Sequence, residues 1–199
     1  FATLAGATRR VQRLEQAIKQ HLDQITALKL DNARFSAGDN GLLNDFAQLR
    51  QLSARQCELT DIPPALGRMR QLQALDLTSN RIRLTAGARE QLGGLIRLQT
   101  LTLDGNPLGQ APNVGRMYRL SELNLANSKI QSWPEGLFKV GDVNRQRPRG
   151  FALDMRDCPI RTLPEVTPGS DQAFVLSRAR FDTALLSDAD RIRYGNYRE

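Results

Sequence analysis

The fold is decided by LQALDLTSNRI at residues 72–82, which matches the pattern L-x-x-L-x-L-x-x-N-x-L at every fixed position. The stretch LQTLTLDGNPL at residues 98–108 matches it equally well. In the L-x-L core the two leucines lie two residues apart, so both point to the same side of a short strand. The asparagine that follows predicts a turn in which its side chain bonds to backbone groups that would otherwise be buried without partners.

Weaker copies of the pattern occur on both sides of these two. Ser128, Cys57 and Cys158 replace the asparagine in three of them, and Ala33 and Ala179 replace it in the first and last. Self-similarity at a period of about 20–30 residues indicates stacked repeats, whose terminal copies are usually atypical. The sequence therefore predicts about seven repeats, which start at residues 25, 49, 72, 98, 120, 150 and 171.

The pattern resembles the leucine-rich repeat, and the resemblance covers about residues 25–181. A second signature of that family lies between the copies, where Ile62-Pro63, Trp133-Pro134 and Leu163-Pro164 are similar to the L-P-x-x-L turn of its convex side. The resemblance implies an α/β leucine-rich-repeat solenoid with a curved parallel sheet on its concave face. Helical caps are expected at both ends, because an uncapped array exposes a sheet edge.

The sequence of each end favours such a cap. Apolar residues recur at i, i+3, i+7 and i+11 from Val11, which predicts a helix. These residues also fit a heptad, but a coiled coil is the weaker interpretation because His21 would occupy a core position. Ser187 is the expected N-cap of a helix near the other end. The predicted parts are an N-terminal capping helix at 1–24, repeats at 25–182, and a C-terminal capping helix and tail at 183–199.

The composition excludes several classes of protein. The 199 residues are 40% hydrophobic and 25% charged, as in a globular protein, and no apolar run approaches the ~20 residues of a membrane span. One histidine and two cysteines argue against a zinc site, and no motif predicts a metal or a cofactor. Because the chain begins with phenylalanine, we expect it to be part of a longer or processed protein. A monomer is the favoured oligomeric state.

The net charge of +7 does not lie on the predicted concave face. The outward positions of the seven predicted repeats hold five basic and six acidic residues, a net charge of −1, which leaves +8 for the rest of the chain. A face that binds nucleic acid is expected to be basic and aromatic, whereas Phe151 is the one aromatic residue at these positions. The pattern therefore favours a protein partner over a nucleic acid.

The predicted function is protein–protein recognition through the concave face, because a rigid sheet displays side chains at fixed spacing. Cys57 and Cys158 occupy a turn position, His21 is distant from both in sequence, and no catalytic motif occurs, so the chain is not predicted to be an enzyme. The residues predicted to bind the partner are Arg55, Asp76, Thr102, Asp104, Glu122, Asn124, Asp154 and Arg156.

One insertion interrupts the repeats at residues 141–149, where Arg145, Arg147 and Arg149 alternate with polar residues and proline. A solvated loop is the simpler interpretation. The alternative is a contact with an anion or an acidic partner, because arginine can pair with a carboxylate through two hydrogen bonds.

The turns, the short array and the arginine-rich composition also resemble the repeat domains of large bacterial proteins, among them secreted effector-type ubiquitin ligases of the NEL class. In that family the repeats select substrates for a separate catalytic domain with a Cys-x-Asp motif. Here Glu58-Leu59 follows Cys57 and Pro159-Ile160 follows Cys158, so the motif is absent. The resemblance implies the substrate-recognition part of a larger enzyme, secreted into a host cell, with a host protein as its partner.

Overall fold

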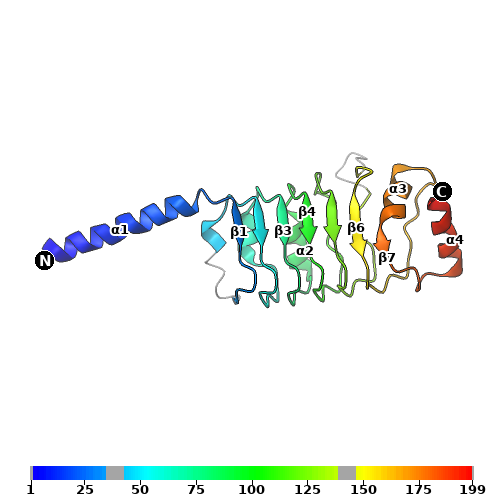
Figure 1. Ribbon diagram of the computed structural model, residues 1–199, viewed down its shortest axis with the longest axis horizontal. Coiled ribbons are helices and arrows are strands. Elements are labelled where there is room, and N and C mark those ends of the chain that lie inside the picture. Colours follow the sequence, from blue (N-terminus) through cyan, green and yellow to red (C-terminus); the bar gives the residue numbers. More distant parts are fainter. Residues whose placement is uncertain (1, 35–42, 139–146, 199) are drawn as a thin grey trace.

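Seven short strands form one parallel sheet whose spatial order follows the sequence from β1 to β7 (Figure 1). The computed structural model describes residues 2–34, 43–138 and 147–198. The strands are β1 (Ala27–Lys29), β2 (Gln51–Ser53), β3 (Ala74–Asp76), β4 (Thr100–Thr102), β5 (Glu122–Asn124), β6 (Ala152–Met155) and β7 (Arg180–Phe181). The helices are α1 (Ala2–Leu22), the 3-10 helix η2 (Pro64–Arg68), α2 (Ala86–Gly93), α3 (Asp171–Arg178) and α4 (Asp188–Tyr197).

The central leucine of each L-x-x-L-x-L copy sets the register between strands. Each such leucine pairs with its counterpart in the next strand, and all but the first are buried. These aligned residues are Leu28, Leu52, Leu75, Leu101, Leu123 and Leu153. The structure therefore confirms the predicted leucine-rich-repeat solenoid, whose core is one continuous stack of leucines from neighbouring repeats.

The asparagine of the repeat joins adjacent turns, as the sequence predicts. Asn80 is 5% exposed, and its Oδ1 accepts hydrogen bonds from the backbone N–H groups of Cys57 at 2.9 Å and Leu59 at 3.1 Å. Its Nδ2 donates to the carbonyl oxygens of Ala54 at 2.9 Å and Leu77 at 2.8 Å. One side chain thus satisfies four backbone groups of two neighbouring repeats.

Serine and cysteine at the asparagine position keep part of this function. The Ser128 hydroxyl donates to the carbonyl oxygen of Leu125 at 2.6 Å, and the Cys158 thiol lies 3.2 Å from the same oxygen. The Cys57 thiol lies 3.1 Å from the carbonyl oxygen of Leu30. Each of these residues is buried and retains a donor, but none has an amide that both donates and accepts.

The residue before the asparagine position adopts a left-handed conformation in the first six repeats. Its φ angle lies between 49° and 73° at Asn32, Gln56, Ser79, Gly105, Asn127 and Asp157. A side chain in this region costs about 1 kcal/mol, and glycine occupies only one of the six positions. Asn32, Asn127 and Asp157 are residue types that tolerate this region, whereas Gln56 and Ser79 do not favour it. At these last two positions the stacking of the repeats therefore imposes the turn geometry.

The predicted start of the last repeat at residue 171 is wrong, because residues 171–178 form helix α3. Ser170 caps this helix by accepting a hydrogen bond from the N–H of Ala173 at 3.1 Å. Phe174 and Leu176 imitate an L-x-L pair, but the buried Ala173 and Leu176 lie three residues apart, as the inward face of a helix requires.

The last strand begins several residues later. Phe181 of β7 pairs with Met155 of β6, so the repeat restarts at Leu176, with Ala179 and Phe181 as its strand pair. Arg180 therefore occupies an outward position of the concave face, opposite Asp154 of the preceding strand.

The expected packing of the N-terminal helix on the first repeat does not occur. Helix α1 points away from the sheet (Figure 1), and its apolar residues Val11, Leu14 and Ile18 are 54%, 61% and 50% exposed. The helix ends with backbone hydrogen bonds from the N–H of Gln24 to His21 and from the N–H of Ile25 to Leu22, and the chain then continues directly into β1. The helix was predicted correctly, but it does not cap the array.

The C-terminal end is covered by α3 and α4 together. Ser187 is the N-cap of α4 and accepts a hydrogen bond from the N–H of Asp190 at 3.1 Å. Helix α4 packs on α3, and Tyr197 is buried with Leu163 and Leu186 in a small second core. This end of the leucine stack is therefore closed by apolar side chains.

Candidate recognition surface

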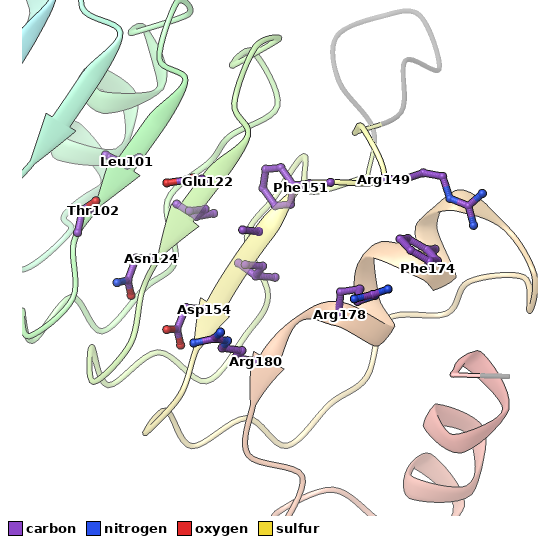
Figure 2. Close-up of a pocket in the computed structure, with 14 residues that line it drawn as sticks. Leu101, Thr102, Glu122, Asn124, Arg149, Phe151, Asp154, Phe174, Arg178 and Arg180 are labelled. Atoms are coloured by element: carbon purple, nitrogen blue, oxygen red, sulfur yellow. The ribbon is translucent and has the colours of Figure 1, made fainter.

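The concave face carries a pocket near its C-terminal end, here called the C-terminal pocket (Figure 2). Its volume is about 670 Å³, and it lies between strands β4 to β6 and helix α3. The strand backbone forms the floor, because the strand leucines point into the core; acidic and amide side chains rise from β5 and β6, and arginines come from the α3 side. The lining residues are Leu101, Thr102, Glu122, Leu123, Asn124, Arg149, Gly150, Phe151, Ala152, Leu153, Asp154, Phe174, Arg178 and Arg180.

A second depression of about 450 Å³, here called the N-terminal groove, crosses β1 to β5. Its lining includes Lys29, Ser53 and Asp76. Thr102 and Glu122 line both the groove and the C-terminal pocket. The two depressions therefore form one furrow across the sheet.

The furrow brings together five of the eight residues predicted to bind a partner. Thr102, Glu122, Asn124 and Asp154 line the C-terminal pocket, and Asp76 joins Thr102 and Glu122 in the N-terminal groove. The three others lie at the strand-exit side and line neither depression; these are Arg55, Asp104 and Arg156.

Three of the predicted residues have a structural role that their outward position did not predict. The Oδ1 atoms of Asp76, Asn124 and Asp154 each accept a hydrogen bond from the backbone N–H two residues further on, at 3.0, 3.1 and 3.1 Å. This is the turn that aspartate and asparagine form with their own backbone, and here it ends the strand. Replacing any of them changes the turn as well as the surface.

Asp76 is further tied into a network at the strand exit. Its Oδ1 accepts a hydrogen bond from the Thr78 hydroxyl at 2.5 Å, and that hydroxyl also lies 2.9 Å from Oδ1 of Asp104. Arg55 forms an ion pair with Asp76 at 3.7 Å. Asp76 and Asp104 are therefore poor positions for a test of binding, because their reversal would break these contacts as well.

Arg156 holds the carboxylate of Asp154 in a two-bond pairing. Its Nε lies 3.0 Å from Oδ1 and its Nη2 lies 2.8 Å from Oδ2. Burial alone would raise the pKa of Asp154, but the side-chain and backbone hydrogen bonds from Arg156 and the charges of Arg156 and Arg180 lower it below its ordinary value of 3.8. Asp154 is therefore ionised at neutral pH, and its acceptor atoms are already occupied.

Four side chains on the α3 side of the C-terminal pocket were not among those predicted to bind the partner: Arg149, Phe174, Arg178 and Arg180. Figure 2 shows Arg149 and Arg178 beside Phe174, with their guanidinium carbons 4.2 Å and 5.1 Å from the ring centroid, and Arg180 beside Asp154. Phe151, expected to be the aromatic residue of the face, is 2% exposed, so Phe174 takes this place. These residues were not predicted because the last repeat was expected to start at residue 171. Only the observed register, with Arg180 opposite Asp154, places α3 and Arg180 beside the pocket.

The arginines of the insertion have different environments. Arg145 lies outside the described residues. Arg149 is exposed and forms an ion pair with Asp171 at 3.6 Å. Arg147 is 4% exposed, so the prediction of a solvated loop is wrong at this position, and residues 141–146 of the insertion lie outside the described residues.

The Arg147 guanidinium binds four backbone carbonyl oxygens. Its Nε donates to Leu137 at 3.1 Å, its Nη2 donates to Val114 at 2.5 Å and Gly136 at 3.0 Å, and its Nη1 donates to Met117. Burial lowers the pKa of Arg147 from 12.5 to about 10, so the group is still charged at neutral pH. One arginine thus joins the convex turns of two adjacent repeats.

The residues with nucleophilic or metal-binding side chains do not come together. Cys57 and Cys158 are both buried and unpaired, and His21 is exposed on α1. Burial raises the pKa of the Cys57 thiol above its ordinary value. Within residues 2–34, 43–138 and 147–198, no group of three His, Cys, Asp or Glu side chains could hold a metal ion, and no helix is long and apolar enough to cross a membrane.

Comparison with solved structures shows which fold this furrow belongs to. A leucine-rich-repeat protein of Leptospira interrogans matches 86% of the chain with a TM-score of 0.56 and 20% identity. Internalin C2 of Listeria monocytogenes matches 83% with a TM-score of 0.53 and 19% identity, and its internalin InlF matches 82% with a TM-score of 0.50 and 15% identity. The likeness shows that the chain has the leucine-rich-repeat fold.

The likeness covers only part of those proteins. The chain spans 46% of the Leptospira protein, 64% of internalin C2 and 48% of InlF. No protein-family model matches the sequence, and no curated protein matches it.

Proposed function

We propose that the chain is a recognition module that binds a partner protein along the concave furrow. The observation that carries the proposal is the continuity of the C-terminal pocket with the N-terminal groove across β1 to β6, through the shared Thr102 and Glu122. A partner that lies in this furrow meets side chains on a hydrogen-bonded sheet, so few of the protein's own groups lose freedom on binding. The proposal includes the expectation that this chain binds its partner without catalysing a reaction.

The test compares replacements in the furrow with replacements on the opposite side. Thr102 and Glu122 are suitable because no hydrogen bond or ion pair ties either side chain to another described residue. Partners are captured with the wild-type chain, and each is then titrated against Thr102→Arg/Glu122→Arg. The control is Arg68→Glu/Arg116→Glu, at exposed residues of η2 and of the loop beside α2.

We expect the furrow variant to weaken binding at least tenfold and the control variant to leave it unchanged. Both variants should unfold at the same denaturant concentration as the wild type, because all four side chains lie at the surface. If the control variant loses the partner and the furrow variant keeps it, the binding surface lies on the convex side and the proposal is wrong.

A narrower proposal is that the module selects substrates for a bacterial effector-type ubiquitin ligase. Its support is the similarity of the Ile62-Pro63, Trp133-Pro134 and Leu163-Pro164 turns to that family. The coding sequence that follows Glu199 tests it. A downstream helical domain with a Cys-x-Asp motif would support the ligase, and a different downstream domain would refute it.

A further inference from the structure

The C-terminal pocket combines an aromatic ring with cationic groups that have few acidic partners. Phe174 is half-buried, and the guanidinium groups of Arg149 and Arg178 lie over its ring. Such a contact uses the flat face of the guanidinium and leaves the N–H groups at its edge available to an acceptor. Arg149 also pairs with Asp171 at 3.6 Å, but both side chains are more than half exposed, so water weakens this pair.

Within the described residues, the acidic residues of the pocket form no ion pair with the remaining arginines, although the charge of Arg180 acts on Asp154. Among the described residues, neither Arg178 nor Arg180 forms an ion pair. Asp154 is the acidic group beside Arg180, but Arg156 already binds both of its carboxylate oxygens. Arg178 and Arg180 therefore present a local positive charge within a face that is close to neutral as a whole.

The strand side of the pocket has the opposite character. Glu122 is exposed on β5 and has no ion pair within the described part of the chain. It lies two strands across from Arg180 on β7 and is offset by two residues along the strands, which gives about 12 Å at ~4.8 Å per strand and ~3.3 Å per residue. Between them on the concave face lies the small, exposed Ala152 of β6, whereas Leu123 and Leu153 point into the core. An extended segment spans about 12 Å with about three to four residues.

From this arrangement we propose that the C-terminal pocket binds a segment of the partner protein in which a Glu or Asp lies beside an aromatic residue. The carboxylate pairs with Arg178 and Arg180, and the aromatic side chain packs against the exposed part of Phe174 and against Ala152. A basic residue about three positions away pairs with Glu122. The inference rests on the proposed function and specifies the chemistry of its partner.

The experiment uses synthetic peptides and not an unidentified partner. The probe is a fluorescent nine-residue peptide with a central Phe-Glu pair and a lysine three positions from the glutamate, made with the lysine on either side because the direction of the segment is open. Matched probes replace the glutamate by glutamine or the lysine by glutamate. A fluorescent 20-nucleotide single-stranded RNA tests the other polyanion that arginines attract. Binding is measured by fluorescence anisotropy with the whole chain.

The proposal predicts that the Phe-Glu probe binds at least tenfold more tightly than the glutamine probe. Arg178→Gln/Arg180→Gln should abolish this preference, and the lysine versions of the two positions should restore part of it because they keep the charge and lose the paired hydrogen bonds. The matched control is Arg161→Gln, an exposed arginine outside both depressions, which should bind like the wild type.

Three results would overturn the proposal: equal affinity for the glutamate and glutamine probes, an unchanged affinity of the Arg178→Gln/Arg180→Gln variant, or tighter binding of the RNA than of any peptide. These failures differ from failure of the proposed function. If Thr102→Arg/Glu122→Arg loses the captured partner while the peptides show no preference, the furrow binds a protein but its acidic segment has been wrongly assigned. If that variant keeps the partner, the furrow itself is not the binding surface.

Discussion

Replacement of Arg147 by alanine should destabilise the protein strongly, although the residue belongs to an arginine-rich insertion. The guanidinium is 4% exposed and donates to four carbonyl oxygens. Two of these, on Val114 and Met117, also accept a hydrogen bond from a backbone N–H. The other two, on Gly136 and Leu137, have no second donor among the described residues.

The magnitude follows from those two carbonyls and from the space that the side chain leaves. A buried polar group without a partner costs about 1–3 kcal/mol, so the two together cost about 2–6 kcal/mol. Removing the buried charge of Arg147 offsets part of this loss of stability, because a buried charge is itself unfavourable. The cavity left beside Phe151 increases the loss. We expect Arg147→Ala to lower the free energy of unfolding by about 3–5 kcal/mol, and Arg147→Lys by about half as much because an ammonium cannot reach all four oxygens.

The assay is unfolding in guanidinium chloride followed by the fluorescence of Trp133, which precedes the Gly136 and Leu137 turn. Arg149→Ala is the matched control, since Arg149 is 61% exposed and should change stability by less than about 0.5 kcal/mol. If Arg147→Ala unfolds within about 0.5 kcal/mol of the wild type, the buried arginine does not join the two repeats and the reasoning is wrong.

Four further predictions concern single positions. Asn80→Ala should cost about 3–5 kcal/mol in chemical unfolding, because it removes four hydrogen bonds and leaves buried N–H groups without acceptors. Gln56→Gly should stabilise the protein by about 0.5 kcal/mol in the same assay, since relief of its φ of 53° outweighs the added chain entropy. The two buried cysteines, Cys57 and Cys158, should react with a thiol reagent only after unfolding, and burial also raises the pKa of the Cys57 thiol. Rapid reaction of the native protein would contradict their assignment to the buried asparagine position of the repeat. The pKa of Asp154 is lowered in the folded state, so its carboxylate stabilises the fold at pH values above the ordinary pKa of 3.8. This contribution is lost as the pH falls below that value. Asp154→Asn should therefore show a shallower loss of stability on acidification.

The repeats were predictable because their signal is a spacing between residues. An L-x-L pair with a leucine three residues before it defines the inward face of a strand without any knowledge of its neighbours, and Leu28 to Leu153 pair as that spacing predicts. The same rule fails at Phe174 and Leu176, where a short capped helix places apolar residues two apart by coincidence. Ser170, which caps that helix, was the local signal that argued against a strand.

The candidate site was less predictable because its properties come from contacts between distant segments. The environment of Arg147 depends on carbonyl oxygens ten to thirty-three residues before it, and no local pattern distinguishes it from the exposed Arg149. Phe174 and Arg180 enter the concave face only because α3 leads into β7. Outward position alone also could not show that Asp76 and Asp154 bond to their own turns.

Only Asn80 and Asn106 keep the asparagine of the repeat, and this unequal distribution affects how cooperatively the array unfolds. In a stacked array each repeat is coupled mainly to its two neighbours, so the coupling energy at each junction decides whether repeats melt together or one after another. That coupling is greatest around Asn80 and Asn106, whose amides bond to two repeats, and weaker toward the ends, where alanine contributes no side-chain bond. Arg147 adds a second strong junction on the convex side. Hydrogen exchange should therefore advance inward from both ends and stop longest at these two places, so that the centre of the furrow keeps its shape while the ends open and close.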